Sequence, residues 1–267
     1  MIIGISNSLG SIIPPITKPI GSIVPSCVFD LDATRIASYA GGNLLNMEGS
    51  PADSDTQDEY DFEAVGASLP VFTGTQGSHD AYFLFDGVGH FKGVNAISDF
   101  LKSIHKTTGG SDFTFVFTVY YISATQAFIT TKNANGINQG VDIYSLSSTD
   151  KVYMNQGDGS ANVGSLSTAT LNASAWNFVA VSHKHSTNTT TFWLNSSAGV
   201  DFSHTFGTTT TDASGAKASI GAYNTGAFPL ANGSRAKSFA GFNAALTDAQ
   251  IAIVANQLNV RHKANYI

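Results

Sequence analysis

The segment DFTFVFTVYYI (residues 112–122) decides the fold of this 267-residue chain. Side chains alternate across a β-strand, so every second residue of the segment lies on the same face. One face is wholly apolar and carries Phe113, Phe115, Phe117, Val119 and Tyr121. The opposite face is partly apolar too, because it includes Val116 and Ile122. We therefore predict a central strand, packed on both faces.

Shorter strands separated by Gly-, Asn-, Asp- and Ser-rich turns are expected on both sides of this segment. They are CVFDL (27–31), AYFLFDG (81–87), AFITT (127–131), GVDIYSL (140–146), KVYMN (151–155), WNFVAVSH (176–183), TTTFWLN (189–195), ASIGAYN (218–224) and RAKSFAGFN (235–243). Many short strands with regular turn signals are typical of a β-sandwich or jelly roll. The predicted class is an all-β, two-sheet jelly-roll sandwich.

The composition excludes several classes of protein. Only 12% of the residues are charged and the net charge is −6, with no basic run, so nucleic-acid binding is not expected. No apolar run is long enough to span a membrane. The single cysteine, Cys27, excludes an intrachain disulfide. The 18 Phe and 9 Tyr can fill a large core, so packing is expected to stabilise the fold.

The chain divides into an arm (1–26) and a domain (27–267). The arm holds four of the seven prolines and a single charge, Lys18, so it is predicted to be extended. Its apolar residues are expected to anchor the protein to neighbouring subunits or other proteins, and the alternative is a disordered or trimmed terminus. The anchoring candidates are Ile12, Ile13, Ile16, Ile20 and Ile23.

Two helices are predicted. Residues 94–105 allow a short helix, because Ile97, Phe100, Leu101 and Ile104 recur at helical spacing. A second helix follows Thr247, which forms a capping box with Gln250. Its apolar stripe is Ile251, Val254 and Leu258, and the basic Arg261, His262 and Lys263 are expected to complement the negative end of the helix dipole.

The order of the elements resembles the concanavalin A-like (laminin G, pentraxin) jelly rolls found in many phage and prophage structural proteins. The pieces that carry the resemblance include FDLDATRIASY (29–39), SDFTFVFTVYY (111–121), TTTFWLNSSAG (189–199) and FAGFNAALTDAQIAIVANQLNVRH (239–262). This resemblance covers residues 27–267. It is a pattern of strands and turns, so it predicts fold more directly than function.

The resemblance implies a non-enzymatic surface protein of a tailed bacteriophage particle, either a capsid decoration or a small tail appendage. Such a protein would be located on the virion and contact other capsid or tail proteins through its arm. It would self-associate as a homo-oligomer, by analogy a trimer. The alternative is an adhesion module that binds a host-surface glycan.

Aromatic side chains are the candidates for glycan binding, because sugar rings stack on exposed aromatic faces. The candidates are Trp193, Tyr223 and Phe228. The competing interpretation places Trp176 and Trp193 in the core.

The acidic stretch before residue 64 offers two further sites. Glu59, Asp61 and Glu63 form the E-x-D-x-E pattern of glycoside hydrolase family 16, which has the same fold class. The hydrolase is the weaker alternative, because the motif comes earlier in the chain than it does in those enzymes. Separately, Asp53, Asp55 and Asp58 are the candidate ligands if the loop binds calcium. The competing interpretation of both patterns is a solvated acidic loop, and no other cofactor is expected.

His183 and His185 lie two residues apart, and His204 follows. Alternation along a strand would place the first two on one face. This pattern permits metal binding, but histidines at strand ends are more often hydrogen-bonded or solvated.

Overall fold

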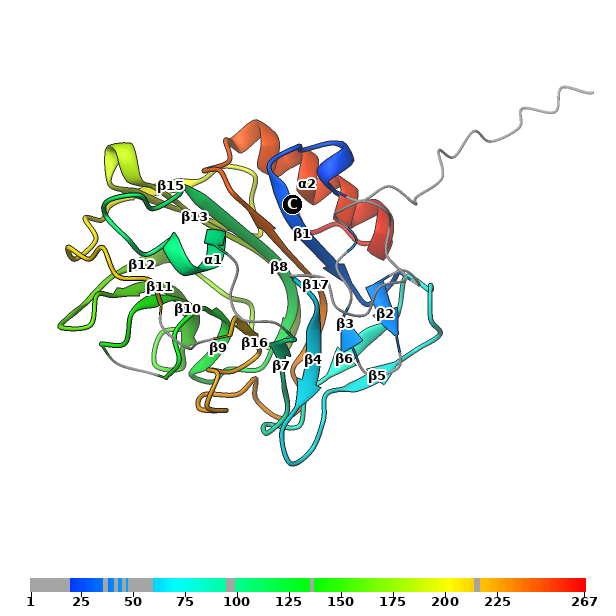
Figure 1. Cartoon of the computed structure of the whole chain (residues 1–267). Coiled ribbons are helices and arrows are strands. Elements are labelled where there is room, and N and C mark those ends of the chain that lie inside the picture. Colours follow the sequence, from blue (N-terminus) through cyan, green and yellow to red (C-terminus); the bar gives the residue numbers. More distant parts are fainter. Residues whose placement is uncertain are drawn as a thin grey trace, which may run out of the picture.

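The computed structural model describes residues 20–35, 38–40, 43–44, 47, 60–94, 99–134, 137–213 and 217–267. Within them the chain forms two antiparallel sheets packed face to face, with a C-terminal helix on the outside of one sheet (Figure 1). This arrangement confirms the predicted two-sheet β-sandwich.

Sheet A has the strand order β15-β14-β13-β8-β17-β6-β5, and β1 pairs with β17. The bounds are β15 Val200–Ser203, β14 Thr189–Leu194, β13 Ala175–Lys184, β8 Phe113–Tyr121, β17 Arg235–Phe242, β6 Tyr82–Leu84, β5 Val71–Thr73 and β1 Cys27–Asp32. The predicted central strand is β8, which lies between β13 and β17.

Sheet B has the strand order β12-β11-β10-β9-β16-β7-β4-β3-β2. The bounds are β12 Asn162–Thr170, β11 Lys151–Gly157, β10 Gly140–Leu146, β9 Gln126–Thr130, β16 Ser219–Ile220, β7 His90–Gly93, β4 Phe62–Val65, β3 Asn43–Leu44 and β2 Tyr39–Ala40. The remaining elements are the helices α1 (Asp99–Ser103) and α2 (Asp248–His262), and the 3-10 turns η1 (Ile20–Ser22) and η3 (His185–Thr187).

The main core lies between the two sheets. It contains the inward-facing aromatic side chains of β8, together with Phe83, Phe91, Phe128 and Phe239. The short helix α1 covers part of the predicted 94–105 segment. Leu101 within the helix and Ile104 directly after it are buried in this core.

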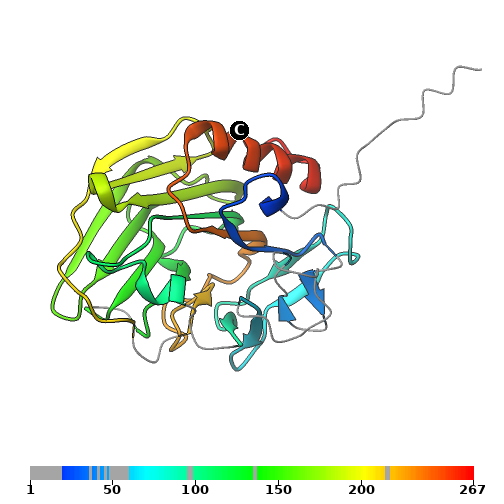
Figure 2. The ribbon, with the colours of Figure 1, turned by 45° about the horizontal axis from the view of Figure 1, so that its top comes forward.

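A second core lies between the outer face of sheet A and α2, where Phe178, Trp193 and Phe242 meet the helix. The predicted stripe of Ile251, Val254 and Leu258 is buried there. The predicted capping box is also present, because Gln250 N–H donates to the Thr247 hydroxyl and Gln250 Oε1 accepts from Thr247 N–H. Both views show α2 and η1 side by side over this face (Figures 1 and 2).

Part of the predicted arm belongs to this second core. Ile20 and Val24 are 1% and 2% exposed under α2, whereas Ile23 is 42% exposed. The backbone N–H of Ile20 also donates to Asp30 at 2.9 Å. Ile12, Ile13 and Ile16 lie outside the described residues. Residues 20–26 therefore pack on the domain itself.

The basic end of α2 turns inward. Arg261 donates to Asp30 Oδ2 at 2.7 Å and lies 3.3 Å from Asp32 Oδ2, with all three side chains fully buried. Burial alone would raise the pKa of Asp32, but His262 and Arg261 hold it well below the usual value. The prediction that Arg261 serves the helix dipole thus missed its main partners, which lie more than two hundred residues earlier in the chain.

Candidate functional site

The structure separates the three aromatic residues predicted to bind ligand. Trp193 lies on β14, on the outer face of sheet A. Tyr223 and Phe228 lie in the loop after β16, on the outer face of sheet B. Two distinct hollows result, one on each face of the sandwich.

The hollow on sheet B is an aromatic pocket with a volume of about 200 Å³. It is lined by Thr125, Tyr144, Leu146, Tyr223 and Phe228. The rings of Tyr223 and Phe228 meet edge to face, with centroids 5.9 Å apart. The Tyr223 side chain is buried, whereas Phe228 is 38% exposed at the rim. The accessible Phe228 ring therefore packs against the buried Tyr223 ring.

The backbone of Phe228 is strained. Its φ is +49°, in the left-handed region that a bulky L-residue rarely adopts. Such a conformation costs about 1–2 kcal/mol. The loop holds it there, because Phe228 C=O accepts from Ala127 N–H at 2.9 Å and Ala227 C=O accepts from Tyr223 N–H at 2.9 Å. The exposed ring is thus a position that the surrounding structure enforces.

A buried ion pair fixes the floor of the aromatic pocket. The Tyr223 hydroxyl donates to Asp142, and Asp142 lies 3.0 Å from Lys132 Nζ, with both charged side chains fully buried. Burial raises the pKa of Asp142, and Lys132 and the Tyr223 hydroxyl oppose that rise. Burial and the neighbouring carboxylate raise the pKa of Tyr223, so its hydroxyl remains a donor.

Sequence reasoning missed the residues that complete this pocket. Asp142 and Tyr144 lie two apart in GVDIYSL, so strand alternation could have placed them on one face. Tyr144 lies opposite Tyr153 across β10 and β11, with ring centroids 5.1 Å apart. The role of Lys132 could not be predicted from a local sequence pattern, because its ion pair with Asp142 depends on how β9 and β10 align.

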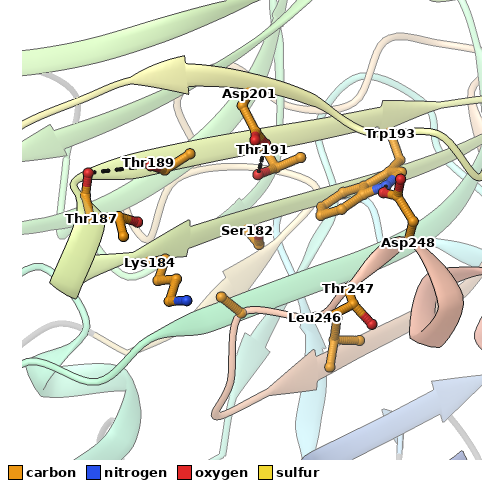
Figure 3. Close-up of a pocket in the computed structure, with 11 residues that line it drawn as sticks. Ser182, Lys184, Thr187, Thr189, Thr191, Trp193, Asp201, Leu246, Thr247 and Asp248 are labelled. Atoms are coloured by element: carbon orange, nitrogen blue, oxygen red, sulfur yellow. Dashed lines mark hydrogen bonds between the residues drawn. The ribbon is translucent and has the colours of Figure 1, made fainter.

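The hollow on sheet A is a polar groove with a volume of about 470 Å³ (Figure 3). Its floor comes from outward-facing residues of β13 and β14, and its wall from residues 245–248, which lead into the first residue of α2. The floor residues are Ser182, Lys184, Thr189 and Thr191. Asp201 on β15 lies opposite Thr191 and accepts its hydroxyl at 2.6 Å.

Trp193 closes one end of the groove without offering a free ring face. It is only 2% exposed, and its indole N–H donates to Asp248 Oδ1 at 2.7 Å. Gly199 lies against the indole, since a Cβ at that position would be 2.6 Å from Trp193 Nε1. The competing core interpretation of Trp193 therefore fits its burial.

The predicted histidines His183, His185 and His204 do come together. His105 is a further buried histidine, whose Nε2 lies 2.9 Å from the Thr211 carbonyl oxygen. His183 stacks on Phe206 with centroids 3.9 Å apart, and its Nδ1 lies 3.0 Å from the Thr190 hydroxyl. That hydroxyl also lies 3.0 Å from His204 Nδ1. No group of three metal-ligating side chains with suitable geometry occurs in the described part of the chain.

Burial keeps these histidines neutral. It lowers the pKa of His183 to about 3 and the pKa values of His204 and His105 to about 4. The pKa of His185 is lowered as well, also by burial. The cluster therefore packs as uncharged rings in the interior.

Of the acidic candidates, the structure describes Asp61 and Glu63. Asp61 is fully buried, and Glu63 on β4 is partly exposed, with its Oε1 4.0 Å from Lys217 Nζ. Glu59 lies outside the described residues, as do the calcium candidates Asp53, Asp55 and Asp58. None of the helices in the described ranges is long and apolar enough to cross a membrane.

No family model matches the chain, and no curated protein matches it in sequence. Several solved structures resemble it. The binding domain of botulinum neurotoxin DC in complex with SialylT is 13% identical, and the match covers 87% of this chain and 52% of that one with a TM-score of 0.58. The botulinum neurotoxin serotype C1 binding domain is 13% identical, over 88% of this chain and 53% of that one, with a TM-score of 0.58.

A third match comes from a structure described by the finding that cell entry of botulinum neurotoxin type C depends on two ganglioside molecules. It is 12% identical, over 90% of this chain and 53% of that one, with a TM-score of 0.59. The chain thus spans about half the length of the structures it matches. What it shares with receptor-binding domains of toxins is the two-sheet β-sandwich fold.

Proposed function

We propose that this protein is a saccharide-binding module and that the aromatic pocket on sheet B holds the sugar. The observation that carries the proposal is Phe228, a large ring that is both exposed and held in a left-handed backbone conformation. Strained residues persist where the surrounding structure enforces them, and they concentrate at functional sites.

The chemistry of the pocket suits a pyranose. The apolar face of a sugar ring can lie against Phe228, while the lining residues Thr125 and Tyr144 carry hydroxyl groups that can exchange hydrogen bonds with a sugar. The Thr125 hydroxyl also contacts the Ser147 hydroxyl at 3.1 Å. The pocket volume of about 200 Å³ corresponds to a single sugar residue. The solved structures that resemble the chain include domains bound to glycans or dependent on gangliosides, which supports the proposal by analogy.

The test is a glycan array probed with the intact chain, followed by titration of the best ligand. Phe228→Ala should weaken binding by about tenfold, which corresponds to about 1.4 kcal/mol. Leu69→Ala is the matched control, because Leu69 is also an exposed apolar side chain, at 50%, in the segment that leads into β5 of sheet A. Equal affinity of the Phe228→Ala variant and the parent protein would remove the pocket from consideration.

Location on a virus particle stays a prediction. The expected assembly is a capsid decoration or tail appendage, in which a saccharide-binding domain would face the host surface. Mass spectrometry of purified particles, with heads and tails separated, tests it directly. Recovery of the protein with tails would support a receptor-binding appendage, and recovery with heads would support a capsid decoration. Absence from both fractions would contradict a location on the virion.

The absence of enzymatic activity is likewise a prediction. Incubation of the bound glycan with the protein should release no new reducing ends. Release that disappears in Glu63→Gln would instead favour the hydrolase.

A further inference from the structure

The groove on sheet A has a regular polar floor. Register places Ser182 opposite Thr191 and Lys184 opposite Thr189, so four residues on one face of two adjacent strands form a rectangle. Neighbouring strands lie about 4.8 Å apart, and same-face residues of one strand about 6.8 Å apart.

The groove has two chemically different ends. Lys184 lies at one end, and Trp193 and Asp248 lie at the other (Figure 3). Asp248 Oδ1 accepts from the Trp193 indole at 2.7 Å and from Gly199 N–H at 3.0 Å. Asp201 accepts from Thr191. Both carboxylates therefore have protein donors already, although each has a second oxygen.

Lys184 differs from these carboxylates. Its side chain is exposed, and no hydrogen bond or ion pair joins its Nζ to another residue in the described ranges. Among the residues that line the groove Lys184 is the one cation, and the carboxylates of Asp201 and Asp248 are the two anions. The Lys184 ammonium group is thus available to pair with an incoming anion.

We infer that this groove is a second saccharide site and that it takes an acidic saccharide. The sugar carboxylate would pair with Lys184, and the hydroxyl groups would bond to the floor and to the second oxygens of Asp201 and Asp248. The contact is polar rather than stacked, because the Trp193 ring is covered. This inference extends the proposed saccharide-binding function to a separate surface and does not require the aromatic pocket to bind anything.

The chain supplies its own reporter for the test. It has two tryptophans, of which Trp193 lines the groove and Trp176 packs against Tyr82, Tyr120 and Lys237. The indole N–H resonances of the intact protein are followed by NMR during titration with methyl glucuronide. Methyl glucoside is the matched ligand, since it replaces the carboxylate by a hydroxymethyl group.

The expected result is a shift of the Trp193 resonance, with Trp176 unmoved, at lower concentrations of the glucuronide than of the glucoside. Lys184→Gln should weaken glucuronide binding about fivefold and leave glucoside binding unchanged, as for an exposed ion pair. Lys151→Gln, on β11 of sheet B, is the control. Added salt should weaken only the glucuronide.

Three results would overturn the inference: no Trp193 shift with either sugar, equal responses to the two sugars, or no effect of Lys184→Gln. Phe228→Ala separates this inference from the proposed function. That variant should bind glucuronide in the groove as the parent protein does. If the aromatic pocket fails its own test while the groove responds, only the first proposal is lost.

Discussion

Trp193 and Asp248 are joined by a 2.7 Å hydrogen bond between the indole nitrogen and Oδ1. The bond links β14 to the first residue of α2, so the helix is attached to sheet A at its N-terminus as well as along its apolar stripe. Asp248 suits this position because a carboxylate is favoured at the positive end of a helix dipole. One interaction therefore positions both the end of the groove and the start of the helix.

Trp193→Phe should lower the free energy of unfolding by about 1–2 kcal/mol, because it removes a hydrogen bond to a charged acceptor. Chemical denaturation measures the change. Trp176→Phe provides the comparison, since it makes the same change of ring on the same sheet without removing a bond to α2. If Trp193→Phe lowers the free energy of unfolding no more than Trp176→Phe does, the hydrogen bond to Asp248 does not stabilise the fold.

Lys132→Met should destabilise the protein more than Trp193→Phe does. It leaves the Asp142 carboxylate buried without its cation, and breaking one partner of a buried pair costs about 3–5 kcal/mol. The double variant Lys132→Met with Asp142→Asn should recover part of the loss, since the uncompensated charge is gone. The melting temperatures of the two variants decide the matter, and equal destabilisation would mean that the charges are not coupled.

At residue 228 the usual order of alanine and glycine should be inverted. In most positions glycine is the less stable of the two, because it loses more backbone entropy on folding. At a φ of +49° the left-handed penalty falls on alanine, so Phe228→Gly should be more stable than Phe228→Ala by about 1 kcal/mol. Thermal unfolding of the two variants measures the difference. A higher stability of Phe228→Ala than of Phe228→Gly would exclude backbone strain at residue 228.

Acid should destabilise the protein well before most carboxylates titrate. The folded pKa values of about 3 for His183 and about 4 for His204 and His105 lie below the value of 6.5 for an unfolded chain. Below pH 6.5 the unfolded state therefore binds more protons than the folded state. The stabilising effect is complete above pH 6.5 and is lost as pH falls towards 4.

Each of these histidines contributes a slope of up to about 1.4 kcal/mol per pH unit within that window. Unfolding free energies measured between pH 7 and pH 4 should show the decline. His204→Gln should make the decline less steep by the share of one histidine, because glutamine does not titrate. A pH-independent stability across this range would mean that the histidines are solvated in the folded protein.

Much of the architecture could be predicted because it is encoded locally. The alternation in β8 is a short-range pattern, and the capping box of Thr247 and Gln250 spans four residues. The pairing of Arg261 with Asp30 could not be predicted, since it depends on how the last helix meets the first strand. The burial of Ile20 depends on the same contact.

The candidate sites follow the same division. Tyr223 and Phe228 could be proposed from residue type, and they do share a pocket. Trp193 was predicted alongside them, but alternation cannot show that a helix covers one face of its strand. The groove beside it was not predicted, because its floor comes from the register of two strands and its wall from a segment more than fifty residues later.

The placement of the two hollows limits how the protein can engage a surface. They lie on the outer faces of opposite sheets, so a flat glycan layer can contact one of them at a time while the other remains open to solution. Two occupied hollows in one copy would therefore bridge separate partners rather than add avidity on a single one. If both proposed sites bind saccharide, a monomeric copy of this domain would act as a cross-linker.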